Sequence, residues 1–130
     1  MPLLDPFWNI TSNPAGGAQA TATHAAVPAI VGQAAKSHIC QSIHATLADG
    51  TGTAAAAAIS IVLRDGPSGS GAIIWSSQLS VPATVGQAAA PVEISGLTIP
   101  GTPGNAMTLE FTAAGAANVF ETVSATGFLA

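Results

Sequence analysis

Three histidines and one cysteine are the residues of this chain whose types are most typical of metal binding. His38, Cys40 and His44 lie close together in the sequence, and His24 lies upstream of them. If residues 37–47 form a strand, the three clustered residues share one face, with the two histidines about 20 Å apart and Cys40 about 7 Å from His38. A tetrahedral metal site needs its ligands closer together than this. We therefore expect no metal or other cofactor, and we interpret Cys40 as a small buried side chain.

The six acidic residues are dispersed, and a single pair is compatible with catalysis. Glu110 and Glu121 fall in two expected strands that we take to be neighbours in a sheet, and paired carboxylates are the machinery of glycoside hydrolases. The chain has no tyrosine and only two tryptophans, so it offers few aromatic platforms for a sugar. A Gly-x-Ser-x-Gly elbow, a phosphate-binding loop and a dinucleotide fingerprint do not occur in the sequence. We therefore expect that the chain is not an enzyme.

The chain is unusually poor in charge. Charged residues make up 6% of the 130 residues, against roughly 25% in typical domains. The two basic residues, Lys36 and Arg64, cannot form the basic face that nucleic acids or anionic lipids require. The sequence has no apolar run long enough to span a membrane, and its first ten residues lack the basic start of a signal peptide. We therefore expect neither nucleic acid nor membrane as a partner, and synthesis in a cytoplasm.

The elements that must position these side chains are expected to be strands. Nine prolines and fourteen glycines leave few gaps long enough for a helix, and the intervening runs are rich in Val, Ile, Thr and Phe. The alanine run Ala54 to Ala58 leaves a helix open as an alternative. About seven or eight strands at short spacing predict an all-β chain with a single β-sandwich or jelly-roll domain. The expected strands are 18–27, 37–47, 53–64, 72–79, 91–99, 106–113 and 117–128.

The first 17 residues differ from the rest and are expected to form an extended arm in front of a domain at 18–130. This arm is interrupted by prolines, closes on Gly16-Gly17 and carries two aromatic residues without helical periodicity. Such an arm either packs across its own domain or docks on a neighbour. Exposed aromatics contribute much of the binding energy of interfaces, so we take the apolar residues of the arm as candidate protein-interface residues. They are Leu3, Leu4, Phe7, Trp8 and Ile10.

One segment is nearly repeated. Residues 27–35 read VPAIVGQAA, and residues 81–89 read VPATVGQAA. Two copies are too few for a solenoid. We interpret them as two equivalent connections, each lying between two strands of the sandwich.

The amino-acid composition also indicates that this domain associates with other subunits. Alanine accounts for 28 of the 130 residues, and so small a side chain buries little apolar area. A domain with a thin core often gains stability by oligomerisation, and a surface with few charges is a poor solubiliser unless partners cover it.

Four short stretches carry a recognisable pattern of turns and strands. They are Asp65-Gly66 before Ile73-Ile74-Trp75, Ile99-Pro100-Gly101-Thr102-Pro103-Gly104-Asn105-Ala106, Ala113-Ala114-Gly115-Ala116 and Ser124-Ala125-Thr126-Gly127-Phe128. Over roughly residues 35–128 this pattern resembles small Ala/Gly/Thr-rich virion proteins of tailed bacteriophages. The resemblance implies a β-sandwich structural protein of the particle, often oligomeric around a symmetry axis, and assigns no catalytic residue.

Within that class we expect a capsid decoration or cement protein that binds and stabilises the shell of major capsid protein. It would be a homotrimer made in the host cytoplasm and located on the capsid surface of the virion. A tail, neck or fibre-associated structural or receptor-binding β-module is the alternative, and a small cupin-like enzyme is a third hypothesis that the histidine spacing disfavours.

Overall fold

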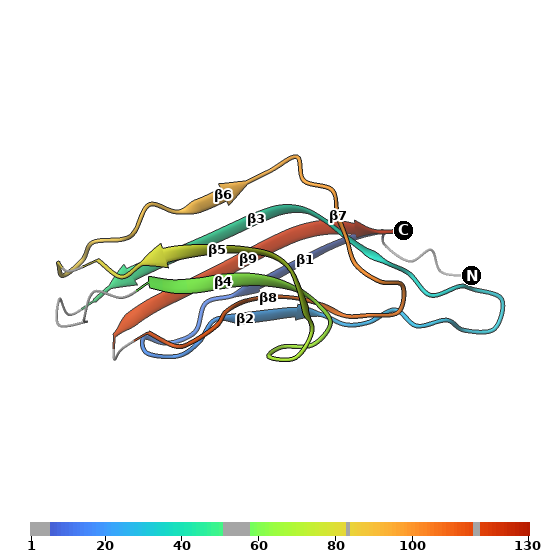
Figure 1. Ribbon diagram of the computed structural model, residues 1–130, viewed down its shortest axis with the longest axis horizontal. Coiled ribbons are helices and arrows are strands. Elements are labelled where there is room, and N and C mark those ends of the chain that lie inside the picture. The colour runs from blue at the N-terminus through green and yellow to red at the C-terminus, as the bar shows by residue number, and fades with distance from the viewer. Residues whose placement is uncertain (1–5, 51–57, 83, 116–117) are drawn as a thin grey trace.

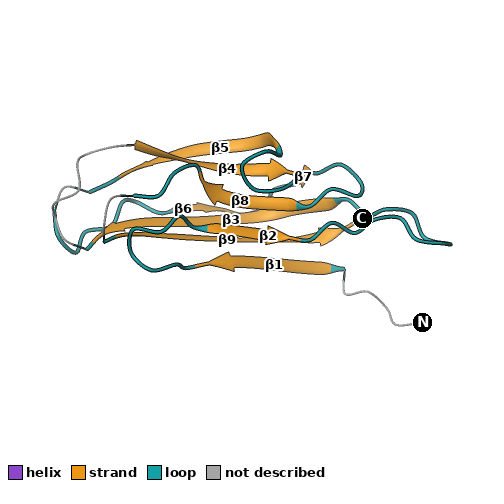
Figure 2. Cartoon of the chain, turned by 90° about the horizontal axis from the view of Figure 1, so that it is seen from below, coloured by secondary structure: helices purple, strands orange, loops and turns teal. Residues whose placement is uncertain are grey.

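The computed structural model describes residues 6–50, 58–82, 84–115 and 118–130. These residues form nine strands in two antiparallel sheets that pack face to face as a β-sandwich (Figures 1 and 2). Sheet A has the order β1-β9-β3-β6, with β7 also beside β3, and its strands are β1 Phe7–Ser12, β3 His38–Asp49, β6 Val92–Ile94, β7 Ile99–Pro100 and β9 Val119–Leu129. Sheet B has the order β2-β8-β4-β5, and its strands are β2 Thr21–His24, β4 Ala58–Asp65, β5 Ala72–Ser80 and β8 Met107–Phe111.

The all-β prediction and the sandwich are confirmed. Each expected strand overlaps an observed one, and the segment 91–99 divides into β6 and β7. Of the alanine run, only Ala58 is described, and it begins strand β4 rather than a helix. Ala54 to Ala57 lie outside the described residues. Among the residues that the structure describes, no helix is long and apolar enough to cross a membrane.

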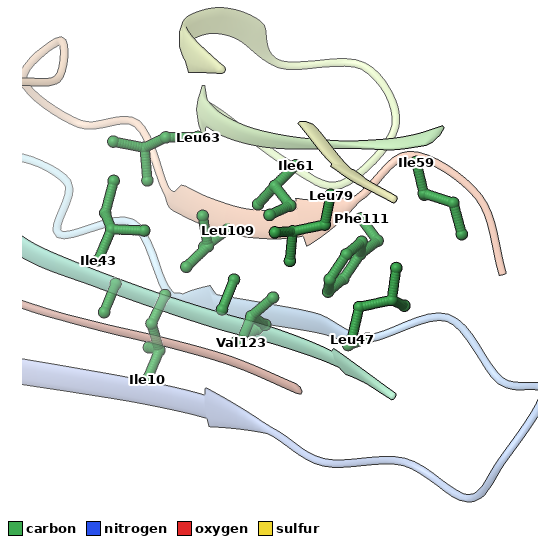
Figure 3. Packing of buried hydrophobic residues seen from close by; sticks show 14 of the residues in the cluster. Ile10, Ile43, Leu47, Ile59, Ile61, Leu63, Leu79, Leu109, Phe111 and Val123 are labelled. Carbon is green, nitrogen blue, oxygen red and sulfur yellow. The ribbon is translucent and has the colours of Figure 1, made fainter. Parts of the chain in front are cut away.

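The core lies between the two sheets because their long strands alternate. In β9 the residues at every second position from Val119 to Gly127 are buried, and the residues between them are exposed or half-buried. Apolar side chains from both sheets meet in the middle, including Leu47, Ile61, Leu109 and Phe111 (Figure 3). Burying such a side chain stabilises a fold by about 1.5–3 kcal/mol, so this layer is the main source of the sandwich's stability.

A β-bulge in β3 overturns one expectation from the strand pattern. The pairing with β9 shifts between Cys40 and Ser42, so that Gln41 is the extra residue. Because a bulge reverses the alternation, His38 and Cys40 point into the core, whereas His44 lies on the outer face. The prediction that all three share one face is therefore wrong. The interpretation of Cys40 as a buried side chain is confirmed, and burial raises the pKa of its thiol to about 11.

Glu121 carries a carboxyl group into the sandwich. It is fully buried, and its Oε2 accepts a hydrogen bond of 2.9 Å from the backbone N–H of Ala20. Burial raises the pKa of Glu121, and the Ala20 hydrogen bond offsets only part of that effect. The folded state therefore favours the protonated form, and the stability that this group contributes is lost as the pH rises through its folded pKa.

We expect the Glu121→Gln variant to be more stable than the wild type by about 1 kcal/mol at pH 7. The amide keeps the shape and the acceptor oxygen but carries no charge to desolvate. The gain should shrink at pH 4, where the wild-type carboxyl group is protonated. Urea unfolding at both pH values measures the difference, with Glu93→Gln as an exposed control. A variant that is less stable at pH 7 contradicts this assignment.

Candidate protein-protein interface

Strand β1 separates the candidate interface residues of the expected arm into two sets. Phe7 faces outward and exposes 68% of its surface, whereas Trp8 and Ile10 expose only 4% and 7% and belong to the core. The Trp8 indole N–H donates a 3.1 Å hydrogen bond to the carbonyl of Phe128. Leu3 and Leu4 lie outside the described residues. Of the three described candidates Phe7 is therefore the one with an exposed side chain, and residues 7–12 are an edge strand of sheet A.

Phe7 begins an apolar row that crosses the outer face of sheet A. It is paired with Phe128 of β9, which is paired with Ile39 of β3, which is paired with Pro100 of β7. Directly opposed residues on one face of a sheet lie about 5 Å apart, so these four side chains form a continuous band. We call this set the Phe7 band. Phe7 and Pro100 at the two ends of the band are exposed, Phe128 is half-buried and Ile39 is buried, and exposed apolar side chains that gather on one face mark interaction sites.

Beside the Phe7 band the outer face becomes polar but stays nearly uncharged. An open hollow of about 460 Å³ is lined by Phe7, Trp8, Asn9, Gln41, Thr126 and Gly127. The bulge that reverses the alternation of β3 adds Gln41 to this lining. Farther along, Thr11 donates to Ser124, and the only ion pair described on this face joins His44 to Glu93 at 3.3 Å. The face therefore offers small hydroxyl and amide groups next to an aromatic ring.

Neither the pair Glu110 and Glu121 nor the cluster of His38, Cys40 and His44 is assembled into one site among the residues that the structure describes. Glu110 and Glu121 lie on different sheets rather than on neighbouring strands, so that expectation is wrong. Glu110 is bound by Arg64, Ser68 and Gly69, whereas Glu121 is bound by Ala20. Among the described residues no group of three or more His, Cys, Asp and Glu is placed to hold a metal ion.

The two sheets are joined at one end by a cluster of three rings. His24 of β2 and His38 of β3 lie 2.8 Å apart from Nδ1 to Nε2, and the Trp8 ring lies 5.7 Å from the His38 ring. Sequence reasoning missed this pair because the two histidines are 14 positions apart and on different sheets. Burial, followed by the charge of neighbouring His24, lowers the pKa of His38, although Asp65 acts in the opposite direction.

We expect the protein to lose stability in mild acid. Because the pKa of His38 is lowered in the folded state, the unfolded chain binds more protons than the folded chain as the pH falls below the ordinary histidine pKa of 6.5. This loss reaches at most about 1.4 kcal/mol per pH unit. Urea midpoints between pH 7.5 and 5.5 measure it. His38→Gln should flatten the slope, and exposed His44→Gln should keep it. An unchanged slope in His38→Gln shows that another group is responsible.

Comparison with known proteins adds no family. No family model matches the chain, and no curated protein matches it. Two solved structures are similar in fold. One is a chain of the cyanophage Pam1 capsid asymmetric unit, with 19% identity and a TM-score of 0.46 over 100% of this chain and 94% of that one. The other is the N-terminal cellulose-binding domain of Cellulomonas fimi β-1,4-glucanase C, with 9% identity and a TM-score of 0.33 over 94% and 87%. At these identities the likeness concerns the fold alone.

Proposed function

We propose that this chain is a structural virion protein of a tailed bacteriophage, a decoration or cement protein that binds the shell of major capsid protein. The observation that carries the proposal is the Phe7 band on the outer face of sheet A. Phe7 is 68% exposed. The rest of this face carries hydroxyl and amide side chains and a single described ion pair. Protein interfaces combine such an apolar centre with a polar rim and few central charges.

The surroundings of Phe7 also suit a contact of this kind. Its neighbours Phe128 and Ile39 are held by backbone pairing in three adjacent strands, so the contact surface is ordered before a partner arrives. Pre-ordering lowers the entropy lost on binding. A homotrimer placed on the capsid surface is the assembly that we propose, because three copies multiply the contacts of one small face.

The experiment uses shells purified from a phage in which the gene for this chain is deleted. Wild-type protein added to these shells should co-sediment with them. Phe7→Ser should weaken this binding at least about 10-fold, since aromatic residues at the centre of an interface contribute about 2 kcal/mol or more. Ile73→Ser removes an exposed apolar side chain from sheet B and should bind as the wild type does.

The same experiment can reject the proposal. Wild-type protein that does not co-sediment would exclude a decoration role, and equal binding of Phe7→Ser would exclude the Phe7 band as the contact. Light scattering of the free protein tests the trimer separately, because a monomeric mass contradicts it.

A tail- or fibre-associated receptor-binding module is the second candidate, and the hollow beside Phe7 favours it. Asn9, Gln41 and Thr126 place two amides and a hydroxyl around the hollow next to the phenyl ring, and these groups both donate and accept hydrogen bonds. This arrangement suits a neutral sugar. Titration with neutral oligosaccharides of the host surface, compared between the wild type and Gln41→Ala, distinguishes this candidate from the first.

A further inference from the structure

The near-repeated segment forms the same turn twice. In the first copy Ile30 and Gln33 exchange backbone hydrogen bonds of 3.0 and 2.9 Å around Val31-Gly32. In the second copy Gln87 N–H donates to the Thr84 carbonyl at 3.2 Å. The third residue of each turn is a glycine with positive φ, 81° at Gly32 and 75° at Gly86, as a type II turn requires.

Both turns present a valine to solvent. Val31 is fully exposed, and Val85, at the equivalent position, exposes 58% of its surface. Ile30, beside Val31, is exposed as well. A β-branched apolar side chain at the tip of a turn contributes nothing to the core of its own domain. Two such valines at equivalent positions therefore point to contacts with something outside the chain.

The two turns lie at opposite ends of the sandwich. In Figure 1 the cyan loop between β2 and β3 reaches beyond the strands at one end, and the gold segment that follows β5 lies at the other. Strand β3 runs between them: the first turn precedes its start, and the second is bound to its last residue, Asp49. The 12 residues of β3 span about 36 Å at 3.3 Å per residue.

Each turn is held firmly by the fold. At the base of the first turn, Lys36 N–H donates to the Val27 carbonyl at 3.0 Å. In the second, Gly86 N–H donates to the Asp49 carbonyl at 2.8 Å, and Asp49 N–H donates to the Gln87 carbonyl at 3.0 Å. The valines are therefore displayed on ordered backbone, which reduces the entropy lost on binding.

We propose that the two turns bind two copies of the same partner protein, one at each end, each through an apolar pocket that accepts the valine. Eight of the nine residues in the two copies of the segment are identical and the turns share one backbone geometry, so a pocket that fits one fits the other. This inference rests on the proposed function, in which the partner is the repeating shell subunit. The chain then links neighbouring subunits, and the Phe7 band, which crosses sheet A near the start of β3, lies against the subunit held by the first turn.

The test compares Val31→Asp, Val85→Asp and the double variant on the gene-deleted shells. Because both ends must be engaged for tight binding, each single variant should lose about 10²-fold in apparent affinity. The two losses should be similar, and the double variant should lose more than either. Ile73→Asp changes an apolar residue outside the turns that is about as exposed as Val85, and this variant should bind as the wild type does.

A loss of binding in these variants would not reflect unfolding, because both valines are exposed. The thermal unfolding of each variant should match that of the wild type. Val31→Ser and Val85→Ser repeat the test without adding charge. Wild-type binding with no loss in either turn variant overturns this inference and leaves the proposed function standing. Failure of the wild type to bind overturns both. A change in the mass of the free protein caused by Val31→Asp makes the turn a self-contact and also overturns the inference.

Discussion

Glu110→Ala is expected to destabilise the protein by about 3–5 kcal/mol. Glu110 is almost fully buried on β8, on the outer side of sheet B. Its Oε1 lies 2.5 Å from the Arg64 Nε and accepts a 2.9 Å hydrogen bond from the Gly69 N–H, while its Oε2 accepts one from the Ser68 hydroxyl. This carboxylate therefore helps to hold the loop at residues 66–71 over the sheet, together with the hydrogen bond from Arg64 to the Gly71 carbonyl.

Removing the carboxylate leaves a buried cation without its partner. The Arg64 side chain is only 14% exposed, and an unpaired charge in such a place is costly. Although burial alone would raise it, the pKa of Glu110 is lowered by hydrogen bonds from Ser68, Gly69 and Arg64, so the folded protein is adapted to the charged form.

Urea unfolding at pH 7 measures the loss. Glu93→Ala removes a carboxylate on a largely exposed side chain and should change stability by less than about 1 kcal/mol. If Glu110→Ala unfolds at the wild-type urea concentration, the loop is not held by this carboxylate.

Gly127→Ala is expected to be the second strongly destabilising change, by at least about 3 kcal/mol. Gly127 of β9 lies between Trp8 of β1 and Cys40 of β3. A Cβ at this position would lie 2.0 Å from the Ile39 carbonyl oxygen and 2.5 Å from Cζ2 of Trp8. Neither neighbour can move easily, because one is backbone and the other fills the core.

Thermal unfolding followed by tryptophan fluorescence suits this test because Trp8 is at the site. The neighbouring Thr126→Ala variant changes an exposed side chain and should lose less than about 1 kcal/mol. A Gly127→Ala protein with the wild-type melting temperature shows that the indole does not occupy the space beside Gly127.

Local sequence patterns predicted the strands, but they missed the features that depend on pairing. The alternation of Val, Ile and Leu with small polar residues was sufficient to place β3, β4, β5, β8 and β9. The same rule applied to β1 separates outward Phe7 from inward Trp8 and Ile10, but the prolines on either side made the segment look like an irregular arm. The bulge at Gln41 has no glycine or other local signal, so its effect on His38 could not be read from the sequence.

Contacts between distant residues explain the rest of the difference. Arg64 and Glu110 are 46 positions apart and meet because β4 and β8 are neighbours in sheet B, which the sequence does not reveal. The two repeated turns, in contrast, could be predicted locally, because a glycine in a near-duplicated segment indicates a connection between strands. Their positions at opposite ends of the sandwich depend on strand order, and only the structure shows them.

The most direct test of the account is a cryo-electron microscopy reconstruction of the gene-deleted shells after the protein has been added. The account predicts ordered density for the sandwich on the shell, with the outer face of sheet A and Phe7 against the capsid and the turns at Val31 and Val85 on two neighbouring subunits. Bare shells, or sandwiches attached through sheet B with Phe7 facing solvent, would contradict it.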